Sequence, residues 1–122
     1  MILVDSSVWI DHLRAAEPML VELLNSGQVL AHPFVVGELA CGNLNNRKAI
    51  LSLLQDLPRA PIATDQEVLR FVERHSLMGK GIGYVDAHLL AATSLEDGGL
   101  LWTRDKRFQA VAESMNLVFK MV

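Results

Sequence analysis

Four acidic residues stand at positions from which they can act together on one substrate. Asp5 directly follows the short apolar run 2–4, and Asp105 follows the apolar run 100–102 after two polar residues. Glu38 and Asp86 lie in segments with helical spacing. Carboxylates gathered in one crevice repel one another, and a divalent cation is the simplest compensation. An all-oxygen set without His or Cys favours a hard ion such as Mg²⁺ or Mn²⁺ over zinc.

Three of these acids also have a purely structural interpretation. Asp5 and Asp105 each precede a predicted helix, where aspartate is a favoured N-cap. Asp86 falls in the first turn of a predicted helix, where the helix dipole stabilises a negative charge. Each position taken alone therefore leaves both interpretations open, and only the set of four favours a metal site.

Glu38 has the strongest case for a role in chemistry. On a helix opened by Pro33 it shares a face with Phe34, Val35 and Gly42, so we expect its carboxylate on an apolar stripe. Burying that charge requires a counter-charge, a hydrogen-bond network or a metal. The alternatives are a tilted helix that leaves Glu38 at the rim, or an arginine partner.

The elements that must position these acids alternate along the chain. Apolar runs predict strands, and apolar residues at helical spacing predict helices. Strand followed by helix through nearly the whole chain predicts one α/β domain over 1–122, with a mostly parallel sheet covered by helices on both faces. Ligands bind such sheets at the carboxyl ends of the strands. We expect strands at 2–4, 29–31, 100–102 and 117–119, and helices at 6–14, 18–26, 33–42, 49–57, 65–78, 84–95 and 105–115.

Composition excludes several classes of protein. The 122 residues are 51% apolar, which is globular and excludes disorder, and the single cysteine excludes an internal disulfide or a cysteine-based zinc site. We find neither a membrane-spanning segment nor a secretory signal, so we expect a cytoplasmic protein. The net charge of −3 argues against broad affinity for nucleic acid. With the four acids assigned to a metal, however, ten acids remain against 11 bases, which would not repel a polyanion.

Three other phosphate-handling motifs do not fit. A haloacid-dehalogenase-type phosphatase needs a second aspartate two residues after the first, where Ser7 stands. A response-regulator receiver needs an acidic pair at the end of the first strand, which Asp5 and Ser6 do not supply. A P-loop needs Lys followed by Ser or Thr, and Lys80 is followed by Gly81.

Four segments of the chain form one pattern, namely VDSSVWID at 4–11, Glu38 after Pro33, GIGYVDAHLLAA at 81–92 and LWTRDKRF at 101–108. Together they resemble a PIN-domain ribonuclease of the VapC toxin type. The resemblance extends over essentially the whole chain. Each motif alone is weak, but four in this order within 122 residues are specific.

The resemblance implies an α/β/α sandwich and Mg²⁺-dependent endonucleolytic cleavage of RNA, with Mn²⁺ as a possible substitute. It also implies a cognate VapB-type antitoxin that inhibits the toxin. By motif, the metal ligands fall on Asp5, Glu38, Asp86 and Asp105, and the hydroxyl positions fall on Ser6 and Thr103. The family often carries another acid two residues after the last aspartate, whereas this chain has Arg107. That departure leaves the four acids intact.

Further expectations concern partners. Four cations near the proposed crevice are candidates for contact with RNA or antitoxin, namely Lys80, Arg104, Lys106 and Arg107. The high apolar content and the segment 87–92, which is apolar over more than one face, predict a homodimer. The rival hypothesis from another class is a metal-free PIN-like module that binds RNA or protein without cutting.

Overall fold

Strand β1 (Ile2–Val4) is the central strand of a three-stranded parallel sheet in the computed structural model, which describes residues 1–121. Its neighbours are β2 (Val29–Leu30) and β3 (Leu100–Trp102), so the order is β2-β1-β3. All three residues of β1 are buried, as expected of a short apolar strand covered on both faces. The prediction of a parallel α/β sheet is confirmed.

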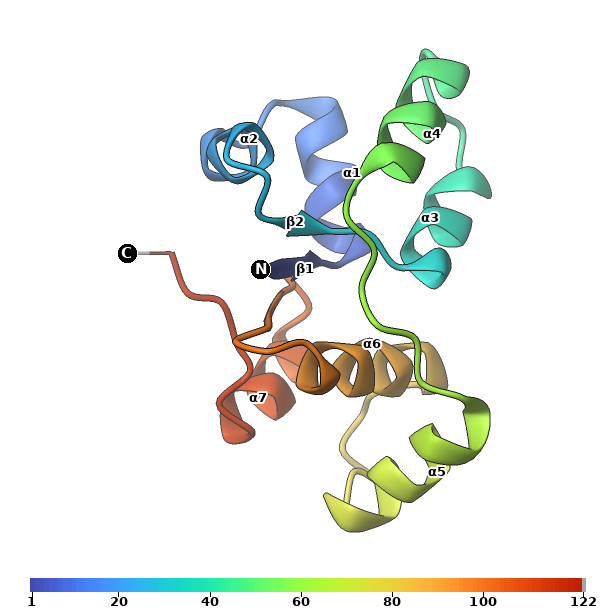
Figure 1. The fold of residues 1–122 in the computed structure, drawn as a ribbon, viewed down its shortest axis with the longest axis vertical. Helices are drawn as coiled ribbons and strands as arrows, with labels where there is room; N and C mark the ends of the chain where they lie inside the picture. Colours follow the sequence, from blue (N-terminus) through green and yellow to red (C-terminus); the bar gives the residue numbers. More distant parts are fainter. Residues whose placement is uncertain (122) are drawn as a thin grey trace.

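Seven helices within residues 1–121 lie on the two sides of this sheet. Figure 1 shows the first four helices on one side of the strands and the last three on the other, which is the expected three-layer sandwich. Parallel strands need long crossover connections, and helices form these connections here. The helices are α1 (Ser6–Arg14), α2 (Pro18–Asn25), α3 (Pro33–Ala40), α4 (Arg47–Asp56), α5 (Asp65–Arg74), α6 (Tyr84–Leu95) and α7 (Lys106–Ser114).

The carboxyl ends of β1 and β3 lie side by side. Val4 pairs with Trp102 in the parallel register, and the Asp5 N–H then donates to the Trp102 carbonyl at 2.9 Å. The ladder therefore fixes the residues that leave these two strands relative to each other. Side chains on 5 and 103 must meet at one edge of the sheet.

Two predicted elements differ from the structure. The strand expected at 117–119 is reduced to an isolated parallel bridge between Leu101 and Val118. The helix expected at 65–78 ends at Arg74, because Ser76 adopts a left-handed φ of 53° and the Leu77 N–H turns back to the Val72 carbonyl. The remaining helix boundaries agree with the predictions to within two residues.

The apolar segment 87–92 packs inside the molecule, which removes it as a reason for dimerisation. All six side chains are buried, together with Thr93, because α6 packs against both β3 and α5. Large apolar side chains are exposed elsewhere instead, including Leu69 of α5, which is 58% exposed. Within residues 1–121, no helix has both the length and the apolar character to cross a membrane.

Candidate active site

Asp5 occupies the innermost position of the candidate site. It stands at the carboxyl end of β1 and is only 6% exposed. Although it occupies the N-cap position of α1, its side chain makes no capping hydrogen bond. Instead, Asp5 Oδ2 accepts hydrogen bonds from Ser7 Oγ and from Thr103 Oγ1, both at 2.8 Å. The capping interpretation of Asp5 is therefore wrong, and its carboxylate is held by hydroxyl groups from two separate parts of the chain.

Ser7 is a site residue that the sequence interpretation missed. Its hydroxyl lies 3.3 Å from Thr103 Oγ1 and accepts a hydrogen bond from the Arg104 N–H at 3.0 Å, in addition to its bond to Asp5. Hydroxyl groups two residues after an aspartate often bond locally in this way, so the spacing from Asp5 was the available signal. The expected residue, Ser6, instead lies beside Glu38 and lowers the pKa of that carboxyl.

Glu38 lies at the rim of the site, and the expectation that its helix buries it is wrong. Helix α3 buries Val35 and Leu39. Phe34 and Glu38, which directly precede them, lie on the neighbouring face of the helix and are exposed. Partial desolvation nevertheless raises the pKa of Glu38, and the negative charges of Asp5 and Asp86 raise it further. The hydrogen bond from Ser6 partly opposes this rise in pKa. Glu38 therefore faces the other acids although solvent still reaches it.

Asp86 is half-buried in the first turn of α6. The Gly83 N–H donates to its Oδ2 at 3.4 Å, which is a long bond, so the cap contributes little. Burial raises the pKa of Asp86, the Gly83 bond opposes that rise, and the charges of Asp5 and Asp105 add to it. A cap alone would leave the pKa of this carboxyl lowered, so its environment is not that of a simple helix cap.

Asp105 is both a helix cap and a neighbour of the other acids. Its Oδ1 accepts from the backbone N–H groups of Arg107 and Phe108, each at 3.0 Å, which confirms the capping interpretation for this residue. Its own N–H donates to Thr103 Oγ1 at 3.1 Å. The carboxylate is exposed, and its charge contributes to the raised pKa of Asp86.

The four acids thus influence one another through their charges. However, no three Asp, Glu, His or Cys side chains within residues 1–121 converge closely enough to hold one ion among them. This spacing still fits Mg²⁺, which usually keeps several waters and takes only one or two protein carboxylates directly. The donors are all oxygen, which also suits a hard cation.

The four candidate cations occupy different environments. The Arg104 guanidinium pairs with Asp11 Oδ2 and with Glu17 Oε2, each at 2.6 Å, and so ties the end of β3 to the first two helices. Its charge is already compensated. Lys80 and Arg107 line one cavity beside α7, whereas Lys106 is exposed on the first turn of that helix.

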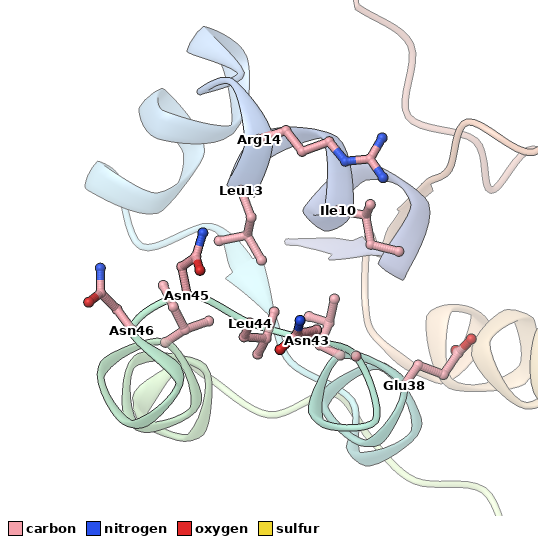
Figure 2. Close-up of a pocket in the computed structure, with 11 residues that line it drawn as sticks. Ile10, Leu13, Arg14, Glu38, Asn43, Leu44, Asn45 and Asn46 are labelled. Carbon is pink, nitrogen blue, oxygen red and sulfur yellow. The ribbon is translucent and has the colours of Figure 1, made fainter.

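An apolar groove opens next to Glu38. It has a volume of about 520 Å³ and lies between α1 and the α3–α4 connection, with Glu38 and Arg14 at its edges. Figure 2 shows Ile10 and Leu13 of α1 facing Leu44 across this groove, with Glu38 at one end. The groove is therefore continuous with the outer part of the acidic site.

Known proteins resemble this chain over nearly its full length. The sequence profile of the PIN domain matches residues 2–114. Ribonuclease VapC32 of Mycobacterium tuberculosis, from both strain CDC 1551 / Oshkosh and strain ATCC 25618 / H37Rv, is 53% identical over 115 residues, which cover 93% of this chain and 93% of the relative. Together with the parallel sheet and its two layers of helices, these similarities show that the chain belongs to the PIN-domain family, in its VapC branch.

Proposed function

We propose that the protein is a metal-dependent endoribonuclease that hydrolyses RNA phosphodiesters and acts as the toxin of a toxin–antitoxin pair. The observation that carries this proposal is the buried Asp5 carboxylate, fixed by two hydroxyl groups and surrounded by three further acids. A purely structural role would not need acids whose mutual charges raise their pKa values. The VapC relatives are named ribonucleases, which supports the same activity.

The residues of the site have two kinds of role: some would bind the metal ion, and others orient the acids. Asp5, Glu38, Asp86 and Asp105 would surround the ion, with one or two of them binding it directly and the others through its waters. We take the ion to be Mg²⁺, with Mn²⁺ as a possible substitute. When bound, the ion would stabilise negative charge on the phosphodiester and make water a better nucleophile. Thr103 and Ser7 keep Asp5 oriented, since both donate to the same oxygen. Ser6 lies beside Glu38, where its hydroxyl opposes the rise in the pKa of that carboxyl.

Cleavage by Asp5→Asn protein tests this proposal directly. The amide keeps the shape of the side chain but removes the charge, so we expect a loss of about 10²-fold or more in the rate of RNA cleavage. Asp97→Asn is the matched control, because Asp97 is exposed beyond the opposite end of α6. Excess EDTA should stop the wild-type reaction.

A different outcome would favour the rival hypothesis. If wild-type protein binds RNA but does not cleave any of a panel of single-stranded and structured RNAs with Mg²⁺ or Mn²⁺, the chain is a silent binding module. If Asp5→Asn protein cleaves as fast as Asp97→Asn protein, the acids have no part in catalysis.

The apolar groove beside Glu38 is our proposed docking site for a VapB-type antitoxin. Its wall is mostly apolar, and a basic side chain of the inhibitor would find Glu38 at its end. Ile10 is 44% exposed in this groove, so Ile10→Asp should weaken inhibition by the antitoxin while RNA cleavage persists. Val21→Asp on α2 is the control, since Val21 is also an exposed apolar residue but lies outside the groove. Equal inhibition of both variants would place the antitoxin elsewhere.

We further propose a homodimer that acts in the cytoplasm. The exposed apolar side chains of Ile62, Leu69 and Leu95 support association, because each leaves more than half of its surface in water. Light scattering at micromolar concentration should give twice the chain mass of 13.5 kDa. Leu69→Glu should shift the protein towards that monomer mass, and a wild-type monomer across this range would refute the dimer.

A further inference from the structure

A second groove, lined by cations, lies beside α7. It has a volume of about 340 Å³ and is bounded by the turn after α5, the loop that leads into α6, and one face of α7. Lys80 and Arg107 supply its charge, and His75 lies at its edge. No acidic side chain lines it. In a chain with a net charge of −3, such a groove is a local concentration of positive charge.

The loop geometry places the two cations next to each other. Gly81 has φ +81°, and a Cβ there would come within 2.7 Å of Arg107 Cδ and 3.3 Å of its Nη1. The Arg107 side chain therefore lies flat against the backbone at the residue that follows Lys80. Any other residue at 81 would be strained and would displace the arginine.

The same arginine is tied to the acidic site through the backbone. Its N–H donates to Asp105 Oδ1 at 3.0 Å, so the groove starts two residues from one of the four acids. Unlike Arg104, which has two carboxylate partners, neither Lys80 nor Arg107 forms an ion pair within residues 1–121. Both charges are thus available to a ligand.

The floor and edge of the groove suit a ligand that is not purely ionic. Leu77 and Val111 are buried beneath it. The His75 ring is exposed and packs against Phe71, with ring centroids 4.5 Å apart. Cations beside an aromatic surface are the combination that binds single-stranded nucleic acid, because phosphates meet the cations and bases stack on the ring.

We propose that this cationic groove binds the phosphates of the single-stranded RNA next to the bond that is cut, through Lys80 and Arg107, with His75 as a stacking surface. The proposal rests on the proposed function, since it extends the RNA path away from the acidic site. It assigns Arg107, at the position where the family often has an acid, to substrate binding.

RNA binding without cleavage tests the groove. In an Asp5→Asn background, fluorescence anisotropy of a labelled single-stranded RNA is measured for Lys80→Gln/Arg107→Gln and for the control Arg47→Gln/Lys48→Gln. Both pairs remove two exposed cations. We expect the groove variant to bind about tenfold or more weakly, and the slope of log affinity against log salt to fall by roughly 1.4, the value for two phosphate contacts. The control should change neither quantity appreciably.

Activity in the unmutated background adds a second readout. Lys80→Gln/Arg107→Gln should raise KM at nearly unchanged kcat, because the cations bind substrate away from the reacting atoms. Arg47→Gln/Lys48→Gln should leave both parameters unchanged, since neither residue lines the groove.

Each result bears on one hypothesis or on both. If the wild type cleaves RNA but the groove variant binds RNA as tightly as its control, the proposed role of the groove in RNA binding is refuted and the proposed function stands. If the groove variant loses affinity for antitoxin and not for RNA, the site belongs to the protein partner and the proposal is wrong. If protein with an intact groove neither binds nor cleaves RNA, both proposals fail.

Discussion

The two halves of the acidic site are built differently. The strand half consists of Asp5, Ser7 and Thr103, which the β1–β3 ladder brings together at one edge of the sheet. The helix half consists of Glu38 and Asp86, which project from α3 and α6 and are more accessible to solvent. Hydrogen bonds fix the first half, whereas burial and then neighbouring negative charge raise the pKa values of both carboxyl groups in the second.

This difference indicates which half of the acidic site is already formed before a ligand binds. A carboxylate that accepts two short hydrogen bonds in a buried position is pre-organised. Carboxylates with raised pKa values still lack a counter-charge, which a cation would supply. We therefore expect removal of a hydroxyl donor in the strand half to lower both stability and the rate of cleavage, and removal of a carboxylate in the helix half to lower the rate of cleavage without lowering stability.

Thr103→Val should produce the largest effect on stability. Valine keeps the shape but removes one of the two donors to Asp5, and hydrogen bonds to charged groups contribute about 1.5–3 kcal/mol. We expect thermal stability to fall accordingly and cleavage to slow by roughly 10- to 100-fold. Thr93→Val is the control, because Thr93 is also buried but donates to the Leu89 carbonyl within α6. A Thr103→Val enzyme with wild-type activity would break the distinction between the halves.

Asp86→Asn should have a moderate effect of opposite sign on stability. Without metal, the folded protein holds a carboxylate whose pKa is raised by burial and by Asp5 and Asp105. Neutralising it should therefore raise the melting temperature at neutral pH by roughly 2–4 °C, while cleavage is lost. A variant that melts below the wild type would show that Asp86 chiefly caps α6.

The pH dependence of that stability difference sharpens the comparison. Because the pKa of Asp86 is raised from 3.8, the folded state binds its proton more tightly, so stability falls as pH rises from that value through the raised pKa. His32 acts in the opposite direction, since burial lowers its pKa from 6.5 to about 4. Both proteins contain His32, so its contribution is removed when the melting temperature of wild type is subtracted from that of Asp86→Asn. The resulting difference should be smallest at acid pH and grow as pH rises, and a flat difference would contradict the account.

The two adjacent serines should give the smallest effects, and unequal ones. Ser7 donates to buried Asp5, so Ser7→Ala should slow cleavage by about tenfold. Ser6 lies beside exposed Glu38 and does not contact Asp5, so Ser6→Ala should slow cleavage only about two- to fivefold. Parallel cleavage assays compare the two, and a larger loss from Ser6→Ala would reverse the assignment of hydroxyl groups.

The strand half was the more predictable from sequence. Apolar runs of three residues indicated the strand ends, and parallel strands place the residues after them at one edge, so Asp5 and Asp105 were expected together. Thr103 was expected at the site only because of the resemblance to PIN-domain ribonucleases. Which of two neighbouring serines reaches Asp5 depends on the rotation of the first turn of α1. Sequence spacing alone does not define that rotation, and Ser7 was missed.

The helix half was less predictable because α3 is apolar almost all round. Phe34, Val35, Val36 and Leu39 allow more than one buried face, so the pattern did not show that Val35 and Leu39 point inward and that Glu38 faces solvent. The cationic groove depends on the left-handed turn at Gly81, which brings Arg107 against the loop. That tertiary contact has no signal in local periodicity.

Calorimetric titration with Mn²⁺ or Mg²⁺ tests most directly the central claim that the acids form one metal site. Wild-type and Asp97→Asn protein should bind the ion with the same affinity, and Asp5→Asn should bind at least tenfold more weakly. The ion should raise the melting temperature of the first two proteins and not of the third, because it binds only the folded site. Equal binding by Asp5→Asn and wild-type protein, with cleavage that persists in excess EDTA, would contradict the account.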